Sequence, residues 1–306
     1  MRLFVIGNGF DRAHDLKTQY WDFRTYLDEF YPDFLDSFEK RYNIYPNDSE
    51  NYKRNLLWNC FETNLANINE DVIIEDALNI DMGLESGDYG IEDTLRIYFR
   101  DEFSYIDKLA IYLKQWVETI KTEDTLPITS QINNGNNDFY ITFNYTSVLE
   151  KVYNIDSSNI LHIHGSLSNN DDDPILGHGN RNRIENIKAK RNMAQTWRNE
   201  KEISICTVIL DYYSKTFKNV RNYMHKLNRF YKYSIDEIII IGHSVDGVDL
   251  PYFKEIDKHT GRKAKWNIYY FDPAKKENMQ NAIENQGISP KRIKMIESYK
   301  FYDLKK

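Results

Sequence analysis

The chain has 306 residues, of which 41% are hydrophobic, and its 23 tyrosines and 16 phenylalanines supply enough apolar surface for a buried core, which excludes a disordered protein. Its formal net charge of −7 at pH 7 argues against a protein that coats nucleic acid through a basic face, so we do not expect nucleic acid as a partner. The only two cysteines of the sequence, Cys60 and Cys206, cannot form a four-cysteine zinc site or a disulfide framework, so we expect no structural zinc. No stretch approaches the roughly 18 apolar residues of a membrane span. We therefore expect a cytoplasmic protein with no membrane partner.

Short apolar runs and helical patterns alternate along much of the chain. Buried strands are predicted at residues 3–6, 139–143, 160–164, 238–241, 266–271 and 293–296. Helices are predicted at 147–153, 252–258 and 274–284, and a long helical region runs from about 183 to 232. Strands that alternate with helices imply parallel β-α-β units with right-handed crossovers.

The segment between the first two strands has a helical pattern. Trp21, Tyr26, Leu27 and Phe30 share one helical face, and a second pattern covers 97–120 after a glycine-containing loop at 81–90. We therefore expect a single α/β domain over residues 1–306. It would contain an open, mostly parallel, Rossmann-like sheet, with a large helical insertion at about residues 20–130.

Four of the predicted strands end in polar or glycine-rich segments. These are Gly7-Asn8-Gly9-Phe10-Asp11, Thr142-Phe143-Asn144-Tyr145, His162-Ile163-His164-Gly165 and Gly242-His243-Ser244-Val245-Asp246. Ligands of open parallel sheets bind outside the carboxyl ends of the strands. If the strands are parallel neighbours, the four segments meet at one edge and form one site.

The glycine turn after the first strand suits either phosphate binding or a structural turn. Gly7 and Gly9 would let backbone N–H groups approach a phosphate beside a helix N-terminus. The dehydrogenase fingerprint is incomplete, because Arg12 stands where its third glycine belongs. The alternative is a tight strand-to-helix turn in which Asp11 is the N-cap.

Asn144 follows the second strand, where its amide could both donate to and accept from a water or a sugar hydroxyl. The alternative is a turn residue that caps the helix starting near Ser147.

The segment after the fourth strand combines Ser244 with Asp246, which suits recognition of a nucleotide ribose and phosphate. Asp249 precedes Leu250 and Pro251, so this carboxylate also fits the start of a helix with proline in its first turn.

His162 and His164 point to the same face if the third strand continues through both of them. They are candidates for acid–base groups or metal ligands, and a structural role for His162 is the alternative. A metal would need a further ligand, for which His178 is the obvious candidate, in a loop at 166–183. This spacing gives little support for a metal, so we predict none.

These segments together resemble the bacterial AbiH abortive-infection family. The resemblance is carried, in order, by Leu3 to His14, Leu16-Lys17-Thr18, Tyr20 to Phe23, Thr142 to Thr146 with Leu149-Glu150, His162 to Gly165, Ile175 to His178, and Ile241 to Ser244 with Asp249-Leu250. The match covers nearly the whole chain and implies an effector of defence against bacteriophage.

More distantly, the same order of segments resembles the sirtuin-like NAD-binding fold. That resemblance implies phosphate contact at Gly7 and Gly9, positioning of a water or ribose by Asn144, and catalysis by His164. It also implies nucleotide contact at Gly242 and Ser244, with Asp11 at the position of a sirtuin serine. The zinc cysteines of sirtuins are missing, so the resemblance implies NAD hydrolysis rather than protein deacylation.

We therefore predict that Asn144, His164 and Asp11 are catalytic and that NAD is the substrate. The expected nucleotide-binding residues are Gly7, Asn8, Gly9, Phe10, Thr142, Tyr145, His162, Gly165, Gly242, His243, Ser244 and Asp246. An NAD hydrolase must be gated, so we expect control by homo-oligomerisation or by a sensor partner subunit. Two alternatives stay open: a non-catalytic nucleotide-binding sensor module, and a metal-dependent phosphoesterase or nuclease that uses His162, His164 and His178.

Overall fold

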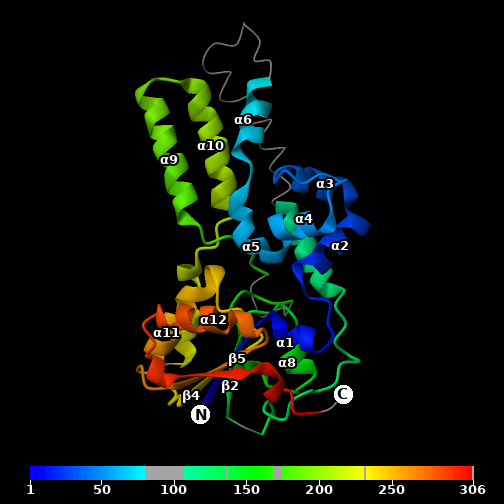
Figure 1. Cartoon of the computed structure of the whole chain (residues 1–306), viewed down its shortest axis with the longest axis vertical. Coiled ribbons are helices and arrows are strands. Elements are labelled where there is room, and N and C mark those ends of the chain that lie inside the picture. The colour runs from blue at the N-terminus through cyan, green and yellow to red at the C-terminus, as the bar shows by residue number, and fades with distance from the viewer. Residues whose placement is uncertain (80–106, 136, 168–173, 231, 305–306) are drawn as a thin grey trace. The chain divides into compact units, whose positions relative to one another are not determined.

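Six strands form one all-parallel sheet in the order β3-β2-β1-β4-β5-β6 in the computed structural model of the chain (Figure 1). They are β1 (Arg2–Ile6), β2 (Phe139–Thr142), β3 (Ile160–His162), β4 (Glu237–Ile241), β5 (Lys265–Tyr270) and β6 (Ile293–Glu297). The structure describes residues 1–79, 107–135, 137–167, 174–230 and 232–304. The strand order is that of a doubly wound, Rossmann-like sheet, so the predicted α/β fold with a helical insertion after the first strand is confirmed.

The register of the sheet brings the carboxyl ends of four strands level with one another. Ile6 of β1 is paired with Thr142 of β2 on one side and with Ile241 of β4 on the other, and Thr142 is paired with His162 of β3. The four polar segments singled out in the sequence therefore leave the sheet at the same edge.

Three strands end earlier than predicted: β5 ends at Tyr270 rather than at residue 271, and β2 and β3 also end early. β2 ends at Thr142, and β3 ends at His162, after which the chain turns at Gly165 with φ of 81°. The prediction that His162 and His164 share a strand face is therefore wrong. The turn sends the two rings into different surroundings.

Each face of the sheet is covered by its own set of helices. The first face packs against α1 (Asn8–Ala13), α8 (Val148–Lys151) and Phe301 near the C-terminus. The second packs against the 3-10 helix Met224–Phe230, α11 (Leu250–His259) and α12 (Lys276–Glu284). From β1 the chain adds β2 and β3 toward one edge of the sheet, and from β4 it adds β5 and β6 toward the other edge. Right-handed crossovers in these two opposite directions place their helices on opposite faces.

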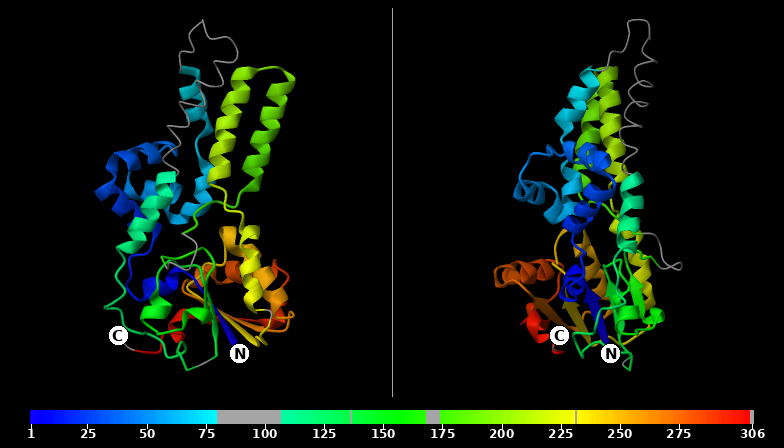
Figure 2. Two further views of the ribbon diagram at one scale, coloured as in Figure 1. Left: turned by 180° about the vertical axis from the view of Figure 1, so that it is seen from behind. Right: turned by 90° about the vertical axis from the view of Figure 1, so that its right-hand side faces the viewer.

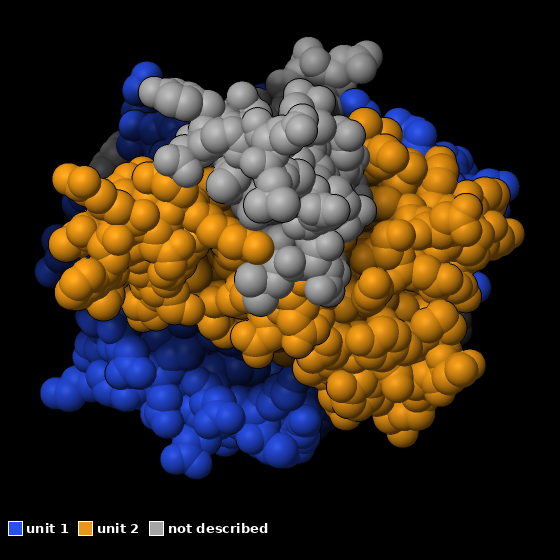
Figure 3. Space-filling model, turned by 90° about the horizontal axis from the view of Figure 1, so that it is seen from above, with its two compact units in different colours: residues 1–22, 114–175, 219–306 blue, residues 23–113, 176–218 orange. Residues whose placement is uncertain are grey.

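The chain divides into two compact units, coloured separately in Figure 3. Unit 1 consists of Met1–Asp22, Lys114–Ile175 and Asn219–Lys306 and contains the whole sheet. Unit 2 consists of Phe23–Leu113 and Leu176–Lys218. It thus combines part of the segment between β1 and β2 with residues from the helical region that follows β3.

Helices account for most of the regular structure of unit 2. The α-helices that lie wholly or largely in it are α2 (Tyr20–Phe30), α3 (Pro32–Lys40), α4 (Glu50–Leu56), α5 (Phe61–Asn64), α6 (Glu70–Asn79), α9 (Arg181–Thr196) and α10 (Glu200–Lys215). Residues 107–118 are also helical, whereas the predicted loop at 81–90 and the first part of the predicted helix at 97–120 lie outside the described residues.

The long helical region predicted after the third strand is interrupted. α9 and α10 form a hairpin, visible as two adjacent helices in the left view of Figure 2. The chain turns between them at Arg198, with φ of 52°, and Asn199 begins α10 by accepting a hydrogen bond from the N–H of Glu202. The predicted helical region therefore consists of successive helices, because an asparagine N-cap starts a second helix.

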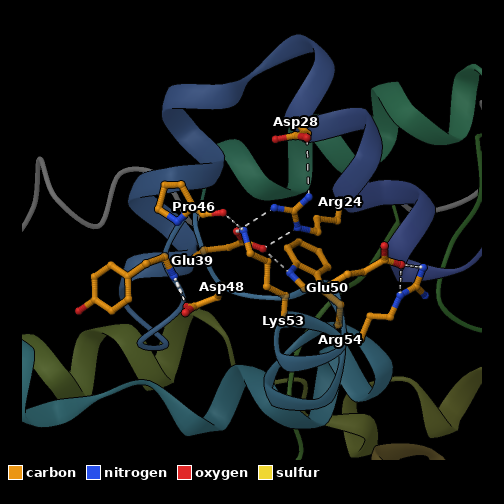
Figure 4. Close-up of polar contacts among 10 residues, drawn as sticks. Arg24, Asp28, Glu39, Pro46, Asp48, Glu50, Lys53 and Arg54 are labelled. Carbon is orange, nitrogen blue, oxygen red and sulfur yellow. Dashed lines mark hydrogen bonds and ion pairs between the residues drawn. The ribbon is translucent and has the colours of Figure 1, made fainter.

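A buried ion-pair network ties together α2, α3 and α4 of unit 2 (Figure 4). Glu39 receives hydrogen bonds from the Arg24 guanidinium at 2.7 and 3.0 Å and from the indole N–H of Trp58 at 2.7 Å. Lys53 Nζ lies 3.8 Å from Glu39 and donates to the carbonyl of Pro46. A carboxylate with 2% exposure is tolerated here because two cations and an indole compensate its lost hydration.

No helix within the described ranges is long and apolar enough to cross a membrane.

Candidate active site

The turn after β1 packs directly against the end of β4. The N–H of Gly7 donates to the carbonyl of Ile241, and the N–H of Gly9 donates to that of Gly242 at 2.7 Å. A Cβ on Gly9 would lie 2.8 Å from the Cα of Gly242, and one on Gly242 would lie 2.2 Å from the N of Phe10. Close backbone approach thus explains these glycines, and their contact with phosphate stays a prediction.

Asp11 is the centre of a buried hydrogen-bonded group beside α1 and α8. One carboxylate oxygen accepts from Nδ2 of Asn144 at 2.8 Å and the other from the hydroxyl of Thr146 at 2.5 Å. Burial raises the pKa of Asp11 from 3.8 to about 6, against the lowering effect of these hydrogen bonds and of the positive charge on His162. The group therefore changes charge close to neutral pH.

The amide of Asn144 is held in one orientation. Nδ2 donates to the carbonyl of Gly7 and to Asp11, so the other atom of the amide, Oδ1, must be the acceptor. Oδ1 receives no hydrogen bond from the residues that the structure describes. It is therefore available to a water or a ribose hydroxyl.

His162 extends this group toward α8. Its Nδ1 lies 3.1 Å from the backbone carbonyl of Asn144, and its Nε2 lies 2.8 Å from Oε1 of Glu150. Both nitrogens face oxygen acceptors, and only an imidazolium donates to both at once. These five residues, Asp11, Asn144, Thr146, Glu150 and His162, are called the Asp11 cluster below. Because both nitrogens of His162 are occupied, the structure supports the structural role for this ring.

His164 lies in a second group, on the face of the sheet covered by α11. Its ring meets Phe143 edge-on at 5.1 Å between centroids and lies 5.7 Å from the ring of Tyr252. Phe143 also meets the ring of His243 edge-on at 4.5 Å. Asp249 lies against both histidines. These five residues, Phe143, His164, His243, Asp249 and Tyr252, are called the His164 cluster.

The two clusters meet along the backbone after β2. Phe143 and Asn144 are consecutive residues, and their side chains enter the His164 cluster and the Asp11 cluster respectively. Alternation of side chains along an extended segment explains the divergence. The structure thus groups Asn144 with Asp11 and His162, and it groups His164 with His243.

The remaining predicted residues are held in other ways. Asn8 forms two hydrogen bonds with Thr18. Phe10 is fully buried in the core between the sheet and α8. Thr142 accepts a hydrogen bond from the N–H of Asn144. Tyr145 donates its hydroxyl to the carbonyl of Ile175 at 2.9 Å.

Ser244 and Asp246 are exposed at the same edge and are joined by a hydrogen bond of 2.7 Å. Their side chains are therefore accessible to a ligand outside the sheet. Their predicted contact with a nucleotide stays a prediction.

Both capping interpretations of the polar strand ends are wrong. Gly7 occupies the N-cap position of α1, so Asp11 lies inside the helix, where its carboxylate accepts from residues after β2. Asn144 does not cap the helix near Ser147, because its side chain points to Gly7 and Asp11. Asp249 does occupy the N-cap position of α11, as predicted, but its carboxylate makes no capping hydrogen bond there.

Five members of the two clusters were missed as site residues by reasoning from the sequence: Phe143, Thr146, Glu150, Asp249 and Tyr252. Thr146 and Glu150 follow Asn144 by two and six residues, so proximity in sequence was an available signal. Tyr252 follows Asp249 within one helical turn but offers no comparable signal.

His178 belongs to unit 2, where its ring lies against Tyr213 and Phe217. Burial lowers the pKa of His178 to about 4, so it stays neutral at physiological pH. Within the ranges that the structure describes, no three His, Cys, Asp or Glu side chains gather closely enough to hold a metal ion.

Comparison with known proteins gives one family match. A family model described as "Bacteriophage abortive infection AbiH" matches residues 3–270 of the chain. The comparison with curated proteins found no match.

Proposed function

The chain belongs to the AbiH family of bacteriophage abortive infection proteins, and from this premise and the geometry of the sheet edge we propose that it is a defence effector that hydrolyses NAD+ at the nicotinamide–ribose bond. The family assignment supports the role in abortive infection. NAD+ as the substrate and the sirtuin-like relationship belong to the proposal.

The position of the polar clusters in the fold carries the proposal. In a sheet of order 3-2-1-4-5-6, strands are added on one side of β1 and then on its other side from β4 onward, and dinucleotides bind outside the carboxyl ends of the strands at this switch point. The segments that leave β1, β2, β3 and β4 here supply a carboxylate, an amide and two histidines. A dinucleotide lying across this edge would reach both clusters.

The chemistry needs a positioned water and stabilisation of a cationic sugar. The bond between the ribose C1′ and the nicotinamide nitrogen breaks with its electron pair going to the nitrogen, which leaves an oxocarbenium-like ribose. A water then forms the new bond to C1′, and its proton is lost to a base, giving nicotinamide and ADP-ribose. Oδ1 of Asn144 orients the water or a ribose hydroxyl, since its Nδ2 is held by Gly7 and Asp11.

Asp11 and His164 have distinct roles in this scheme. With a pKa of about 6, Asp11 is mostly ionised above neutral pH and stabilises positive charge on the ribose. His164 accepts the proton released by the water or by a ribose hydroxyl, a role that contributes about 10² to 10⁴ in rate.

The activity is expected to be gated, because continuous NAD+ hydrolysis would exhaust the host cell. We propose that assembly into a homo-oligomer, or binding of a subunit that detects infection, switches the site on. Sedimentation of the purified chain with and without lysate from infected cells tests this point, and a fully active monomer would contradict it.

Incubation of the purified chain with NAD+, with and without that lysate, tests the proposed reaction through the amount of nicotinamide released. We expect release by the wild type, a loss of at least 100-fold in His164→Ala and Asn144→Ala, and no change in the exposed controls His225→Ala and Asn281→Ala. Activity that survives both site substitutions would overturn the mechanism. Tight NAD+ binding without turnover under either condition would instead favour a non-catalytic nucleotide sensor.

A further inference from the structure

The ring of Phe271 is exposed to solvent directly after β5. It is 92% exposed, the highest value of any large hydrophobic side chain among the residues that the structure describes. Trp266, Ile268 and Tyr270 of the same strand are buried. Burial of an aromatic ring is among the most favourable contributions that a side chain can make, and Phe271 gains almost none of it within the chain. The ring is therefore accessible to a ligand.

The register of the sheet places Phe271 at the edge where the site lies. Ile268 of β5 is paired with Ile240 of β4. β5 ends at Tyr270, two residues beyond this pair, and β4 gives way to a turn at Gly242, with φ of 71°, also two residues beyond it. Phe271 and the segment that follows β4 therefore leave adjacent strands at the same level.

Polar groups suited to a ribose lie on that neighbouring segment. Ser244 and Asp246 are exposed, and the hydroxyl of Ser244 donates to Oδ1 of Asp246 at 2.7 Å. An acidic side chain at the carboxyl edge of a dinucleotide-binding sheet accepts hydrogen bonds from ribose hydroxyls. An aromatic ring beside such a carboxylate matches the two parts of a nucleoside, the base and the sugar.

The division of the sheet into two halves indicates which nucleoside this is. A dinucleotide-binding sheet of this order consists of two halves that each bind one mononucleotide. The half made of β1, β2 and β3 carries the Asp11 cluster, where the bond to nicotinamide is proposed to break. β5 lies three strand positions from β2, or about 14 Å at a spacing of about 4.8 Å. The half that contains β5 is therefore left for adenosine.

We propose that Phe271 stacks on the adenine base of NAD+, next to the ribose contact predicted for Ser244 and Asp246. This inference rests on the proposed function, since it assigns the second half of the same substrate. Stacking on an aromatic side chain contributes affinity for a base and depends little on which base it is. Phe271 thus favours a dinucleotide over nicotinamide mononucleotide, which has no second base.

Isothermal titration calorimetry of the purified full chain with ADP-ribose tests the contact without any turnover, because ADP-ribose has the adenosine half and lacks the bond to nicotinamide. We expect Phe271→Ala to weaken the binding of ADP-ribose about 5- to 150-fold. Phe271→Trp keeps an aromatic face and should stay within about threefold of the wild type. The control Trp197→Ala removes a ring that is 79% exposed in unit 2 and should leave the affinity unchanged.

Two further measurements separate stacking from a general disturbance of the edge. The affinity for nicotinamide mononucleotide should be equal in the wild type and in Phe271→Ala. In NAD+ hydrolysis, Phe271→Ala should raise KM by about the factor found for ADP-ribose, with kcat within about twofold, because the base takes no part in the reaction.

The outcomes distinguish this inference from the proposed function. Equal affinity of the wild type and Phe271→Ala for ADP-ribose, or no binding of ADP-ribose by the wild type, would overturn the inference even if NAD+ is hydrolysed. Equal weakening of ADP-ribose and nicotinamide mononucleotide would also overturn it. Binding of ADP-ribose that depends on Phe271, in a chain that does not hydrolyse NAD+, would support the adenosine site and overturn the proposed reaction.

Discussion

Asn144 donates its side-chain amide to the carboxylate of Asp11 over 2.8 Å, although the two residues are 133 positions apart in the chain. This bond joins the helix after β1 to the segment after β2, at the edge where the sheet order places ligands. It fixes the amide so that Oδ1 stays available, and it keeps a carboxylate in a buried position. Asp11 and Asn144 are therefore expected to act as one unit in stability and in activity.

The buried carboxyl of Asp11 predicts a specific pH dependence of stability. Its pKa is about 6 in the folded chain, against 3.8 as the ordinary value, so the folded state binds the proton more tightly. This contribution is fully present below pH 3.8 and is lost as the pH rises through about 6. The difference corresponds to about 3 kcal/mol, from the two-unit shift.

The variant Asp11→Asn isolates this effect, because asparagine stays neutral. Relative to the variant, the wild type should lose about 2.5 kcal/mol of unfolding free energy between pH 4 and pH 7. Urea unfolding of both proteins across this range gives the measurement. If the unfolding free energies of the two proteins changed equally with pH, Asp11 would have the same proton affinity in the folded and the unfolded chain.

Replacing Asn144 by aspartate should place two carboxylates against each other in a buried site. At pH 8 we expect Asn144→Asp to reduce the unfolding free energy by about 3 kcal/mol, because the donor to Asp11 becomes a like charge. At pH 5 the loss should be smaller, since one proton can be shared between the two groups. The exposed control Asn281→Asp should change stability by less than about 0.5 kcal/mol at either pH, and equal losses in the two variants would contradict the account.

Two glutamates of unit 2 provide a matched test of buried and exposed ion pairs (Figure 4). Glu39→Gln should cost about 3 to 5 kcal/mol of unfolding free energy, because Arg24 and Lys53 lose the carboxylate that compensates their burial. Glu50→Gln removes the exposed pair with Arg54 and should cost no more than about 1 kcal/mol. Chemical unfolding of both variants measures the contrast, which similar losses would refute.

Gly242 and Gly287 test the close approach of the β1 turn to β4. Both have positive φ, but a Cβ on Gly242 would lie 2.2 Å from the N of Phe10, whereas one on Gly287 would meet nothing within 4 Å. Gly287→Ala should therefore cost only backbone strain of about 1 to 2 kcal/mol. Gly242→Ala should cost clearly more or prevent folding, as read from thermal unfolding and the yield of folded protein, and equal effects would argue against the contact.

The sheet could be predicted from sequence because parallel buried strands produce continuous apolar runs such as Ile238 to Ile241, which need no knowledge of tertiary structure. Strand ends were harder to predict. Ile163 and His164 have side chains compatible with a strand, but β3 ends at His162 and the chain turns at Gly165. Phe143 also has such a side chain, although β2 ends at Thr142.

The candidate site was predicted only in part, for a physical reason. The rule that polar segments gather at the carboxyl edge identified Asp11, Asn144 and His164, but it does not say which face of the sheet each side chain enters. The pairing of Asp11 with Asn144, and of His164 with Asp249, depends on long-range packing. Asp249 in particular had a sufficient local explanation as a helix N-cap, which concealed its position between two histidines.

The most direct measurement is the cellular content of NAD+ and nicotinamide during bacteriophage infection of a host that carries the chain. The account predicts that NAD+ falls and nicotinamide rises after infection with the wild type, and that both stay at control levels with His164→Ala produced in equal amount. Protection of the culture with unchanged NAD+, or NAD+ loss that is equal in the His164→Ala strain, would contradict it.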